Sequence, residues 1–435
     1  MKSLRDIAAL VSGYDPNALP VAQAQEFIAR LVPSVTTVEM LPLRSALGRV
    51  LARDLVSPFD VPANDNSAMD GYALRGADLA ADAPTRLTMA GIGLAGQPFT
   101  GVVPAGQCLR ITTGAVMPDG LDTVVPQEFV TVDGDSVVFP GGVARPGDNR
   151  RLAGEDLAAG SAALAAGRVL RPADLGMIAS LGVAEVPVLR RLRVAFFSTG
   201  DELRSIGEPL DAGCVYDSNR YTLWGMLQRL NVELLDLGVV RDDPAALEAA
   251  FRQAAESADA VITSGGVSVG EADYTKRIMA QLGEVLFWRI AMRPGRPMAI
   301  GRIGARPDVE GRTSGAGHQA ILFGLPGNPV AVMVTFYAFV RAALLAMSGA
   351  TVEPLPMLRA ASTAAIRKKP GRTEYQRGIV TRDAGDQWRV AITGSQGSGI
   401  LRSMSVANGL VVLHHAQGNV APGELVDVLP FDGLV

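Results

Sequence analysis

An alternation of strand-like and helix-like segments between Arg193 and Met347 limits the possible folds of this chain more than any other feature. The strand-like segments are rich in apolar residues and read RVAFFST, VELLDLGVV, DAVITSG, EVLFWRI, PMAIGRI and AILFGLP. Helices are expected over 218–230, 244–257, 272–282 and 328–347. Such alternation predicts a parallel sheet with helices on both faces. Ligands of such sheets bind outside the carboxyl ends of the strands, so the loops at that edge matter most.

The segments on either side of this alternation have a different residue pattern, which is richer in short strands and turns. Between Leu51 and Gly142, short β-rich pieces alternate with Gly, Pro and Asp turns, which is typical of a small all-β unit. After Gly349 the pattern again indicates strands and turns. Two further helices are expected, one after Pro20 and one over 172–181. The fold class expected from these patterns is a multidomain α/β plus β protein.

The charge balance and the apolar stretches exclude two classes of protein. The 435 residues carry 40 Lys and Arg against 44 Asp and Glu, whereas general nucleic-acid binders usually present a strongly basic face. The longest apolar stretch, 330–340, ends at Arg341 and is shorter than the roughly 20 residues that span a bilayer, so we expect a buried helix. Arg5 and Asp6 lie where a signal peptide would be apolar, which predicts a cytoplasmic protein.

Cysteine and histidine usage does not indicate a metal centre. Cys108 and Cys214 belong to no CxxC pair, which argues against a zinc site and against a disulfide framework. The three histidines, His318, His414 and His415, cannot easily build a catalytic metal triad.

Three loops follow strands of the expected sheet and should converge on one edge. They contain STGDE at 198–202, SGGVSVG at 264–270 and LPGNP at 325–329. The middle loop has glycines and serines ahead of a helix, which suits a phosphate because the backbone can approach closely and a helix dipole is favourable there. It matches neither the P-loop nor the dinucleotide-binding pattern. A plain tight turn between strand and helix is the alternative interpretation.

Acidic and basic side chains cluster in the same region. The acidic residues are Asp201, Glu202, Asp242, Asp243, Glu271 and Asp273. Carboxylates beside a phosphate site commonly hold Mg²⁺, and the alternative is helix capping, which we favour for Asp243 before Pro244. Downstream, Arg293 and Arg296 are held three apart across a Pro-Gly turn, which suits a gripped oxyanion; surface ion pairing is the alternative.

Several ordered motifs together resemble the molybdopterin molybdenumtransferase family, which includes bacterial MoeA and the E domain of gephyrin. The motifs are DNSAMDGYA, TGAVMPDGLDTVV, RLAGEDLAAG, STGDEL, SGGVSVGEADY, RPGRP, LPGNPV and TGSQGSGILRSMSVANGL, and they cover nearly the whole chain. The resemblance implies a homodimer of four-domain subunits. The implied domains are a discontinuous helical domain at 1–48 and 146–190, an inserted β-rich domain at 49–145, a molybdopterin-binding α/β domain with a mostly parallel sheet at 191–349, and a C-terminal β-barrel-like domain at 350–435.

The resemblance also implies an activity. In this family, adenylylated molybdopterin is hydrolysed in a reaction that depends on molybdate and Mg²⁺, molybdate enters the dithiolene, and AMP leaves. This is the last step of molybdenum cofactor biosynthesis. It implies a molybdopterin adenylyltransferase upstream and molybdoenzymes or their chaperones downstream, without nucleic acid or membrane partners.

The site residues implied by the resemblance come from several segments. They are Asp65 and Thr113 from the second domain of the partner subunit; Arg151 and Asp156 from the segment that re-enters the first domain; Glu202, Asp242, Asp273, Ser264, Gly265, Gly266, Ser268 and Gly270 around the pterin, phosphate and metal; and Arg293, Arg296, Pro326, Asn328, Pro329, Arg372 and Ser398 around molybdate. Asp65, Glu202, Asp242 and Asp273 are the predicted catalytic residues, and the last three are the predicted Mg²⁺ ligands.

Two positions depart from the family pattern. The family typically has lysines at the positions of Arg293 and Arg296, and often a serine at the position of Ala331. Arginine keeps the charge and adds a planar fork, so oxyanion binding should survive, with consequences for selectivity between molybdate and tungstate. A lost serine hydroxyl removes at most one hydrogen bond, worth about 0.5–1.5 kcal/mol.

Two other functions compete with the transferase. A molybdopterin adenylyltransferase would share the α/β domain and its glycine loop but use ATP, and the second-domain and C-terminal motifs argue against it. A non-catalytic dimeric scaffold is the other alternative, and retention of Asp65, Glu202 and Asp273 argues against that as the main role.

Overall fold

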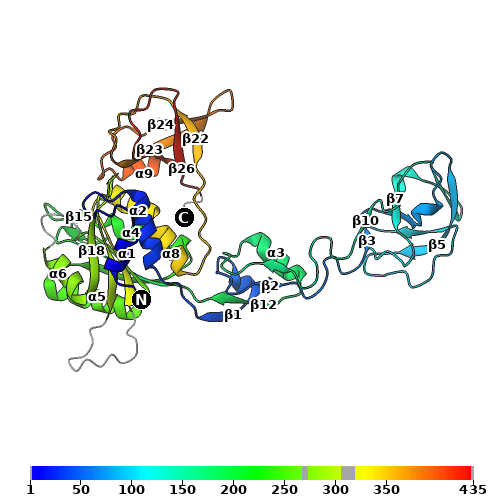
Figure 1. The fold of residues 1–435 in the computed structure, drawn as a ribbon, viewed down its shortest axis with the longest axis horizontal. Helices are drawn as coiled ribbons and strands as arrows, with labels where there is room; N and C mark the ends of the chain where they lie inside the picture. The colour runs from blue at the N-terminus through cyan, green and yellow to red at the C-terminus, as the bar shows by residue number, and fades with distance from the viewer. Residues whose placement is uncertain (1, 267–272, 305–318, 433–435) are drawn as a thin grey trace. The chain divides into compact units, whose positions relative to one another are not determined.

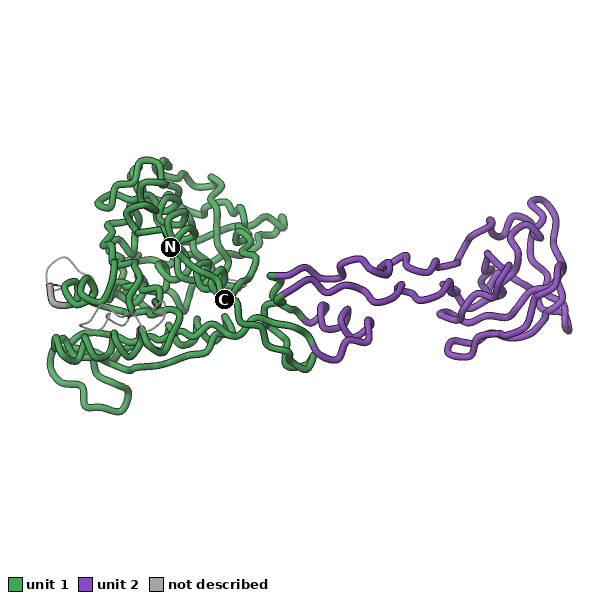
Figure 2. The backbone as a smooth tube through the Cα atoms, turned by 60° about the horizontal axis from the view of Figure 1, so that its bottom comes forward, with its two compact units in different colours: residues 1–52, 167–171, 186–435 green, residues 53–166, 172–185 purple. Residues whose placement is uncertain are grey.

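The computed structural model describes residues 2–266, 273–304 and 319–432, which form two compact units (Figure 2). Unit 1 comprises Met1–Ala52, Gly167–Arg171 and Val186–Val435, and unit 2 comprises Arg53–Ala166 and Pro172–Glu185. The chain therefore passes between the two units several times. The division into four domains stays a prediction.

A six-stranded mixed sheet forms the centre of unit 1. Its strand order is β16-β13-β17-β21-β20-β18. The bounds are β13 Arg193–Thr199, β16 Glu233–Val240, β17 Ala260–Ser264, β18 Gly283–Arg289, β20 Pro297–Gly304 and β21 Gln319–Leu325. The first four strands in this order are parallel, whereas β20 is antiparallel to β21 and to β18. The sequence patterns of β18, β20 and β21 follow one another with no helix expected between them, whereas a parallel pair needs a long crossover connection, usually a helix.

Helices cover both faces of this sheet (Figure 1). The bounds are α1 Leu4–Ala9, α2 Val21–Leu31, α4 Ser218–Arg229, α5 Pro244–Ser257, α6 Asp273–Leu282, α7 Pro329–Thr335 and α8 Arg341–Met347. Alternation along β13 assigns the faces: Val194 and Phe196 pack with α2, α4, α7 and α8, and Ala195 and Phe197 pack with α5 and α6. The helix expected over 244–257 has the same bounds in the structure, with Pro244 at its start and Asp243 accepting a hydrogen bond from Ala246 N at 2.9 Å.

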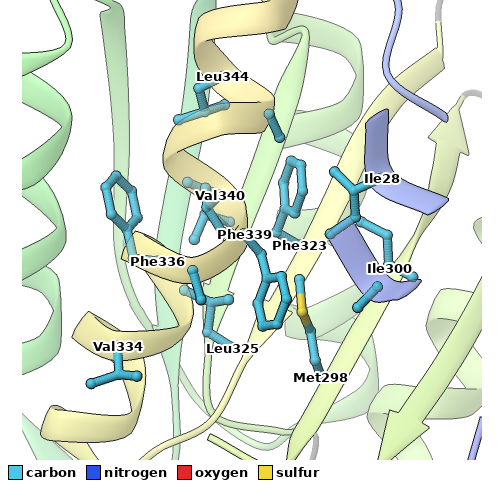
Figure 3. Close-up of a cluster of buried hydrophobic side chains, with 14 of the residues drawn as sticks. Ile28, Met298, Ile300, Phe323, Leu325, Val334, Phe336, Phe339, Val340 and Leu344 are labelled. Atoms are coloured by element: carbon cyan, nitrogen blue, oxygen red, sulfur yellow. The ribbon is translucent and has the colours of Figure 1, made fainter. Parts of the chain in front are cut away.

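A continuous helical run from Pro329 to Met347 packs at the centre of unit 1. It consists of α7, a π-helical segment η4 (Phe336–Val340) and α8. Phe336, Phe339 and Leu344 lie among side chains of the sheet and of α2 (Figure 3). The run is long and apolar enough to cross a membrane by length and composition, but 61% of its most apolar stretch is buried inside the protein. The buried helix expected at 330–340 is confirmed, although it is longer than the apolar stretch.

The C-terminal part of unit 1 is a closed five-stranded barrel. The pairings β23–β24, β24–β22, β22–β26, β26–β25 and β25–β23 complete the ring. The bounds are β22 Leu358–Ser362, β23 Thr373–Arg382, β24 Trp388–Ile392, β25 Gly409–Leu413 and β26 Leu425–Pro430, with α9 at Arg402–Val406. A short strand, β19 (Met292–Arg293), pairs with β23 and so joins the barrel to the loop between β18 and β20. The barrel-like C-terminal fold expected from the resemblance is confirmed.

Unit 2 is built on a six-stranded sheet with the order β7-β4-β6-β5-β9-β8. The bounds are β4 Gly71–Leu74, β5 Thr85–Gly93, β6 Gln107–Ile111, β7 Thr123–Pro126, β8 Thr131–Asp133 and β9 Ser136–Phe139. The unit also contains the strand pairs β2 (Leu55–Val56) with β11 (Ala162–Leu164) and β3 (Asn66–Ser67) with β10 (Arg150–Arg151), and the helix α3 (Pro172–Ser180). Two small apolar clusters, one on Leu109 and Val124 and one on Cys108 and Phe139, stabilise the sheet.

Candidate functional site

A cavity of about 880 Å³ lies at the carboxyl ends of β13, β17 and β21 in unit 1. Its walls come from the three loops that follow these strands, from the Arg293 turn and from the C-terminal segment 396–398. The convergence expected from the sequence is therefore confirmed. The predicted site residues that line the cavity are Glu202, Asp242, Ser264, Gly265, Gly266, Arg293, Pro326, Asn328, Pro329 and Ser398.

Gly265 allows the glycine loop to pack directly on its neighbours. Its φ is +97°, and a Cβ atom there would lie 2.5 Å from the carbonyl oxygen of Thr199. Its N–H donates to the carbonyl of Leu325 at 3.1 Å. A side chain at this position would separate loops that are in contact, so the glycine is required by geometry as well as by conformation. The predicted residues Ser268 and Gly270 lie outside the described part of the chain.

Asn219, at the start of α4, is a cavity residue that the sequence analysis missed. Its Nδ2 donates to Ser264 Oγ and to the carbonyl oxygen of Gly327, both at 2.7 Å. The side chain thus joins the loop after β17 to the loop after β21. Sequence offered a weak signal only, because the neighbouring Asp217 accepts from Arg220 N and caps α4, and an Asp-Ser-Asn run at a helix start is explained by capping alone.

Two acidic residues predicted to hold metal line the cavity. The Glu202 carboxylate folds back over Gly200, where a Cβ would lie 2.5 Å from Glu202 Oε2. Asp242 is exposed, and its backbone N–H donates to Asp201 Oδ1 at 3.2 Å. Asp273 is the first residue of α6, and its side chain is outside the part of the chain that the structure describes. Within the described ranges, no three His, Cys, Asp or Glu side chains form a group that could hold a metal ion.

Only one of the two predicted oxyanion-binding arginines lines the cavity. Arg293 is exposed and lines the cavity, whereas Arg296 is not among the lining residues. The turn between them is closed by a hydrogen bond of 2.7 Å from Ile290 N to the carbonyl of Arg296. Gly295 in this turn has a φ of +91°, and a Cβ there would lie 2.4 Å from Thr335 Oγ1. The turn is therefore packed against α7, which fixes the backbone that carries Arg293.

Arg377, in strand β23 of the C-terminal barrel, holds a segment of the cavity wall in place and was not predicted from the sequence. Arg377 is fully buried and donates to Gly397 O and Ser403 Oγ, each at 2.9 Å. Burial lowers the pKa of Arg377, and repulsion from Arg293 lowers it further, so the two guanidinium groups influence each other. Ser398 accepts a hydrogen bond from Val330 N at 3.1 Å, which ties this segment to α7.

The remaining predicted residues of unit 1 are Arg372 and those of the loop after β21. Arg372 forms an ion pair with the buried Glu374 at 2.7 Å and does not belong to the lining residues. Asn328 stands at the N-cap of α7 without a side-chain capping bond, next to Pro329 in the first helical position. Ala331, where the family often has serine, also lines the cavity.

Four predicted residues lie in unit 2. Asp65 accepts hydrogen bonds from Arg150, with which it forms an ion pair, and from Ala153 N at 2.7 Å; these contacts lower its pKa. Thr113 donates from its backbone N–H and its hydroxyl to Asp70 Oδ1, at 2.6 and 2.8 Å. Arg151 and Asp156 are exposed. The carboxylate beside Thr113 is therefore Asp70, which the sequence analysis did not select.

Comparison with known proteins gives three matches that follow one another along the chain. Residues 19–182 match the MoeA N-terminal region (domain I and II), 195–346 a probable molybdopterin binding domain, and 359–431 the MoeA C-terminal region (domain IV). The chain is 40% identical to the molybdopterin molybdenumtransferase of Haemophilus influenzae over 96% of this chain and 100% of the relative. The chain belongs to the molybdopterin molybdenumtransferase family.

Other members of the molybdopterin molybdenumtransferase family and a related structure extend this result. Molybdopterin molybdenumtransferase 2 of Mycobacterium tuberculosis is 34% identical over 94% of this chain and 98% of the relative. Gephyrin of Dictyostelium discoideum is 30% identical over 96% of this chain and 63% of the relative. The crystal structure of a molybdopterin biosynthesis MoeA protein from Pyrococcus horikoshii superimposes with a TM-score of 0.77 at 28% identity, covering 95% of this chain and all of that one.

Proposed function

We propose that this protein inserts molybdate into adenylylated molybdopterin, with hydrolysis of the adenylyl group and release of AMP. This would be the last step of molybdenum cofactor biosynthesis. The observation that carries the proposal is one cavity that gathers a glycine loop, two carboxylates and an exposed arginine from separate segments of a chain in this family. The cavity offers the charges that a phosphate ester and an oxyanion both need.

The chain's own residues would act mainly by positioning and by charge. Hydrolysis at a phosphoryl centre needs little covalent help from a protein, so alignment and neutralisation of charge dominate. The loop at Ser264 and Gly265 would hold the phosphate, because glycine lets the backbone approach closely. Arg293 would bind molybdate through a charge-assisted contact, and the buried Arg377 adds a second positive charge that Arg293 influences electrostatically.

The described side chains fit Mg²⁺ on chemical grounds. Glu202 and Asp242 offer carboxylate oxygens on the wall of the same cavity, and Mg²⁺ commonly binds one or two carboxylates together with waters and substrate phosphates. We therefore propose Glu202 and Asp242 as its ligands, with Asp273 remaining a predicted third. When bound, the ion would polarise the phosphoryl oxygens.

The remaining parts of the proposal concern assembly and context. We propose a homodimer in which Asp65 and Thr113 of one subunit complete the site of the other, with Arg151 and Asp156 supplied by the segment that re-enters the first domain. The protein would work in the cytoplasm, after a molybdopterin adenylyltransferase and before molybdoenzymes or their chaperones. The division into four domains belongs to the same proposal.

A single-turnover assay tests the function directly. Purified protein is mixed with adenylylated molybdopterin and Mg²⁺, and AMP release is followed with and without micromolar molybdate. We expect molybdate-dependent release in the wild type. Arg293→Ala should need at least about tenfold more molybdate, since a hydrogen bond to a charged group contributes about 1.5–3 kcal/mol. Arg359→Ala removes an exposed barrel arginine as the matched control.

Other outcomes of this assay contradict the proposal in different ways. ATP-dependent adenylylation of free molybdopterin, without hydrolysis, would move the function to the preceding enzyme of the pathway. Tight binding of adenylylated molybdopterin with neither reaction would leave a scaffold. An unchanged molybdate requirement in Arg293→Ala would remove that arginine from the oxyanion site.

A further inference from the structure

The Asn219 side chain connects two walls of the cavity while itself being buried. It is 7% exposed, and its Nδ2 donates to Ser264 Oγ and to Gly327 O, both at 2.7 Å. Ser264 ends β17 and Gly327 lies in the loop after β21, so the two acceptors belong to strands that are neighbours in the sheet. This amide group, together with the Gly265–Leu325 hydrogen bond, therefore joins two loops that line the cavity.

The two acceptors determine the orientation of the amide. The Gly327 carbonyl has no hydrogen to donate, so it must face the NH₂ group, and both amide hydrogens are then in use. Asn219 Oδ1 is then buried without a partner among the described residues. An unsatisfied buried acceptor costs about 1–3 kcal/mol, so packing alone does not explain an asparagine here.

The orientation of Asn219 has a consequence for Ser264. Because Ser264 Oγ accepts the amide hydrogen, its own hydroxyl hydrogen points away from Asn219. Ser264 lines the cavity, and a hydroxyl that accepts one hydrogen bond becomes a stronger donor in another. The group best matched to such a donor is an oxyanion oxygen of the ligand.

We propose that Asn219 is a positioning residue, which orients the Ser264 hydroxyl toward a phosphate oxygen of the ligand and fixes the loop at Gly327 opposite it. The proposal relies on the proposed function for one point, namely that the ligand carries a phosphate ester. Asn219 acts through Ser264 and Gly327 and does not itself contact the ligand.

A double-mutant cycle on the full-length protein tests this mechanism. AMP binding is measured by calorimetry for the wild type, Asn219→Ala, Ser264→Ala and the double variant. Each single variant should bind about tenfold more weakly, the effect of one hydrogen bond to a charged group. The double variant should be no weaker than Ser264→Ala, because Asn219 acts through that serine. Thr222→Ala, on the same helix with a local bond to Ser218 O, should bind like the wild type.

Two results would overturn the proposal: losses that add in the double variant, or wild-type affinity in Asn219→Ala. Should Asn219→Ala fold poorly, Asn219→Asp replaces the NH₂ group with an oxygen that repels the Gly327 carbonyl, and it must also bind weakly.

If the wild type binds no AMP, the proposed function fails, but hydrogen exchange still tests whether Asn219 positions the loops. Peptides that contain the Gly265 amide, bonded to Leu325 O, must then exchange faster in Asn219→Ala, and unchanged exchange overturns the proposal.

Discussion

At the scale of single residues, burial makes the two cysteines chemically different. Cys108 lies within the unit 2 sheet and is fully buried, and burial raises the pKa of its thiol to about 11. Cys214 is partly exposed and precedes Val215, which lines the cavity. Reactivity toward thiol reagents depends on the thiolate fraction and on access, so Cys214 should react in the native protein and Cys108 should not.

We expect an aromatic disulfide reagent at about pH 8 to modify one thiol per native chain, because Cys108 is both inaccessible and protonated there. The measurement is absorbance of the released thiolate, before and after denaturation in urea. Cys214→Ser should abolish the native reaction and leave the reaction of the denatured chain. A fast native reaction in Cys214→Ser would contradict the burial of Cys108.

The Asp70–Thr113 pair should make unit 2 sensitive to acid. The backbone N–H and the hydroxyl of Thr113 lower the pKa of Asp70 below its ordinary value of 3.8. A depressed carboxylate pKa contributes stability above 3.8, and this contribution is lost as the pH falls through the lower folded value. Asp70→Asn should therefore be less stable than the wild type at neutral pH, and the difference should narrow at about pH 3.

Urea denaturation followed by circular dichroism, at neutral pH and at about pH 3, measures this narrowing. Asp82→Asn removes a charge of the same sign from an exposed position of unit 2 and serves as the matched control. A midpoint difference for Asp70→Asn that is the same at both pH values would show that its ionisation does not stabilise the fold.

At the scale of elements, the contact between strand ends shapes the cavity. The loop after β17 approaches the end of β13 so closely that Gly265 has room for hydrogen alone. The same loop is tied to β21 by the Gly265–Leu325 hydrogen bond. Gly265 is thus packed into the sheet edge by contacts with both neighbouring strands.

Gly265→Ala should destabilise unit 1 by about 1–3 kcal/mol, from the left-handed backbone conformation and the contact with Thr199 O. Urea denaturation followed by tryptophan fluorescence reports this unit, because Trp224, Trp288 and Trp388 all lie in it. Gly225→Ala is the matched control in the same unit, since a Cβ within α4 meets nothing within 4 Å. An unchanged midpoint in Gly265→Ala would show that the loop can move without cost.

At the scale of the whole molecule, the distribution of predicted residues bears on assembly. Thr113 lies in unit 2, whereas the cavity with Arg293 is lined by unit 1 residues among those described. In a homodimer whose sites are each completed by both subunits, Thr113 of one subunit would act together with the cavity residues of the other.

At a molybdate concentration that limits Arg293→Ala, we expect Thr113→Ala and Arg293→Ala to be weakly active separately and more active when mixed. Random exchange of subunits makes half of the dimers mixed, and each mixed dimer has one site without either substitution, so about one quarter of wild-type activity should return. The measurement is molybdate-dependent AMP release after the subunits are dissociated and reassembled together. Absence of any recovery, with mixed dimers demonstrated by mass, would place the whole site within one subunit.

The sequence alone determined the elements and the location of the cavity. Pro244 and Asp243 predicted the start of α5, and apolar patterns predicted β13, β17 and β21, because capping and periodicity act over a few neighbouring residues. The parallel connection between these strands then places their following loops at one edge. The assignment of Ser264, Gly265 and Asn328 to the cavity therefore follows from strand order and loop position in the sequence.

Only the tertiary structure decided which side chains are partners. The contacts of Arg377, Asp70 and Asn219, and the ion pairs of the predicted residues Arg372 and Asp65, are visible only in the folded chain. The antiparallel direction of β20 in the main sheet was also set at this level. The physical reason is that strand register and burial bring together groups distant in the chain, such as Asn219 and Gly327, and local patterns carry no information about such pairings.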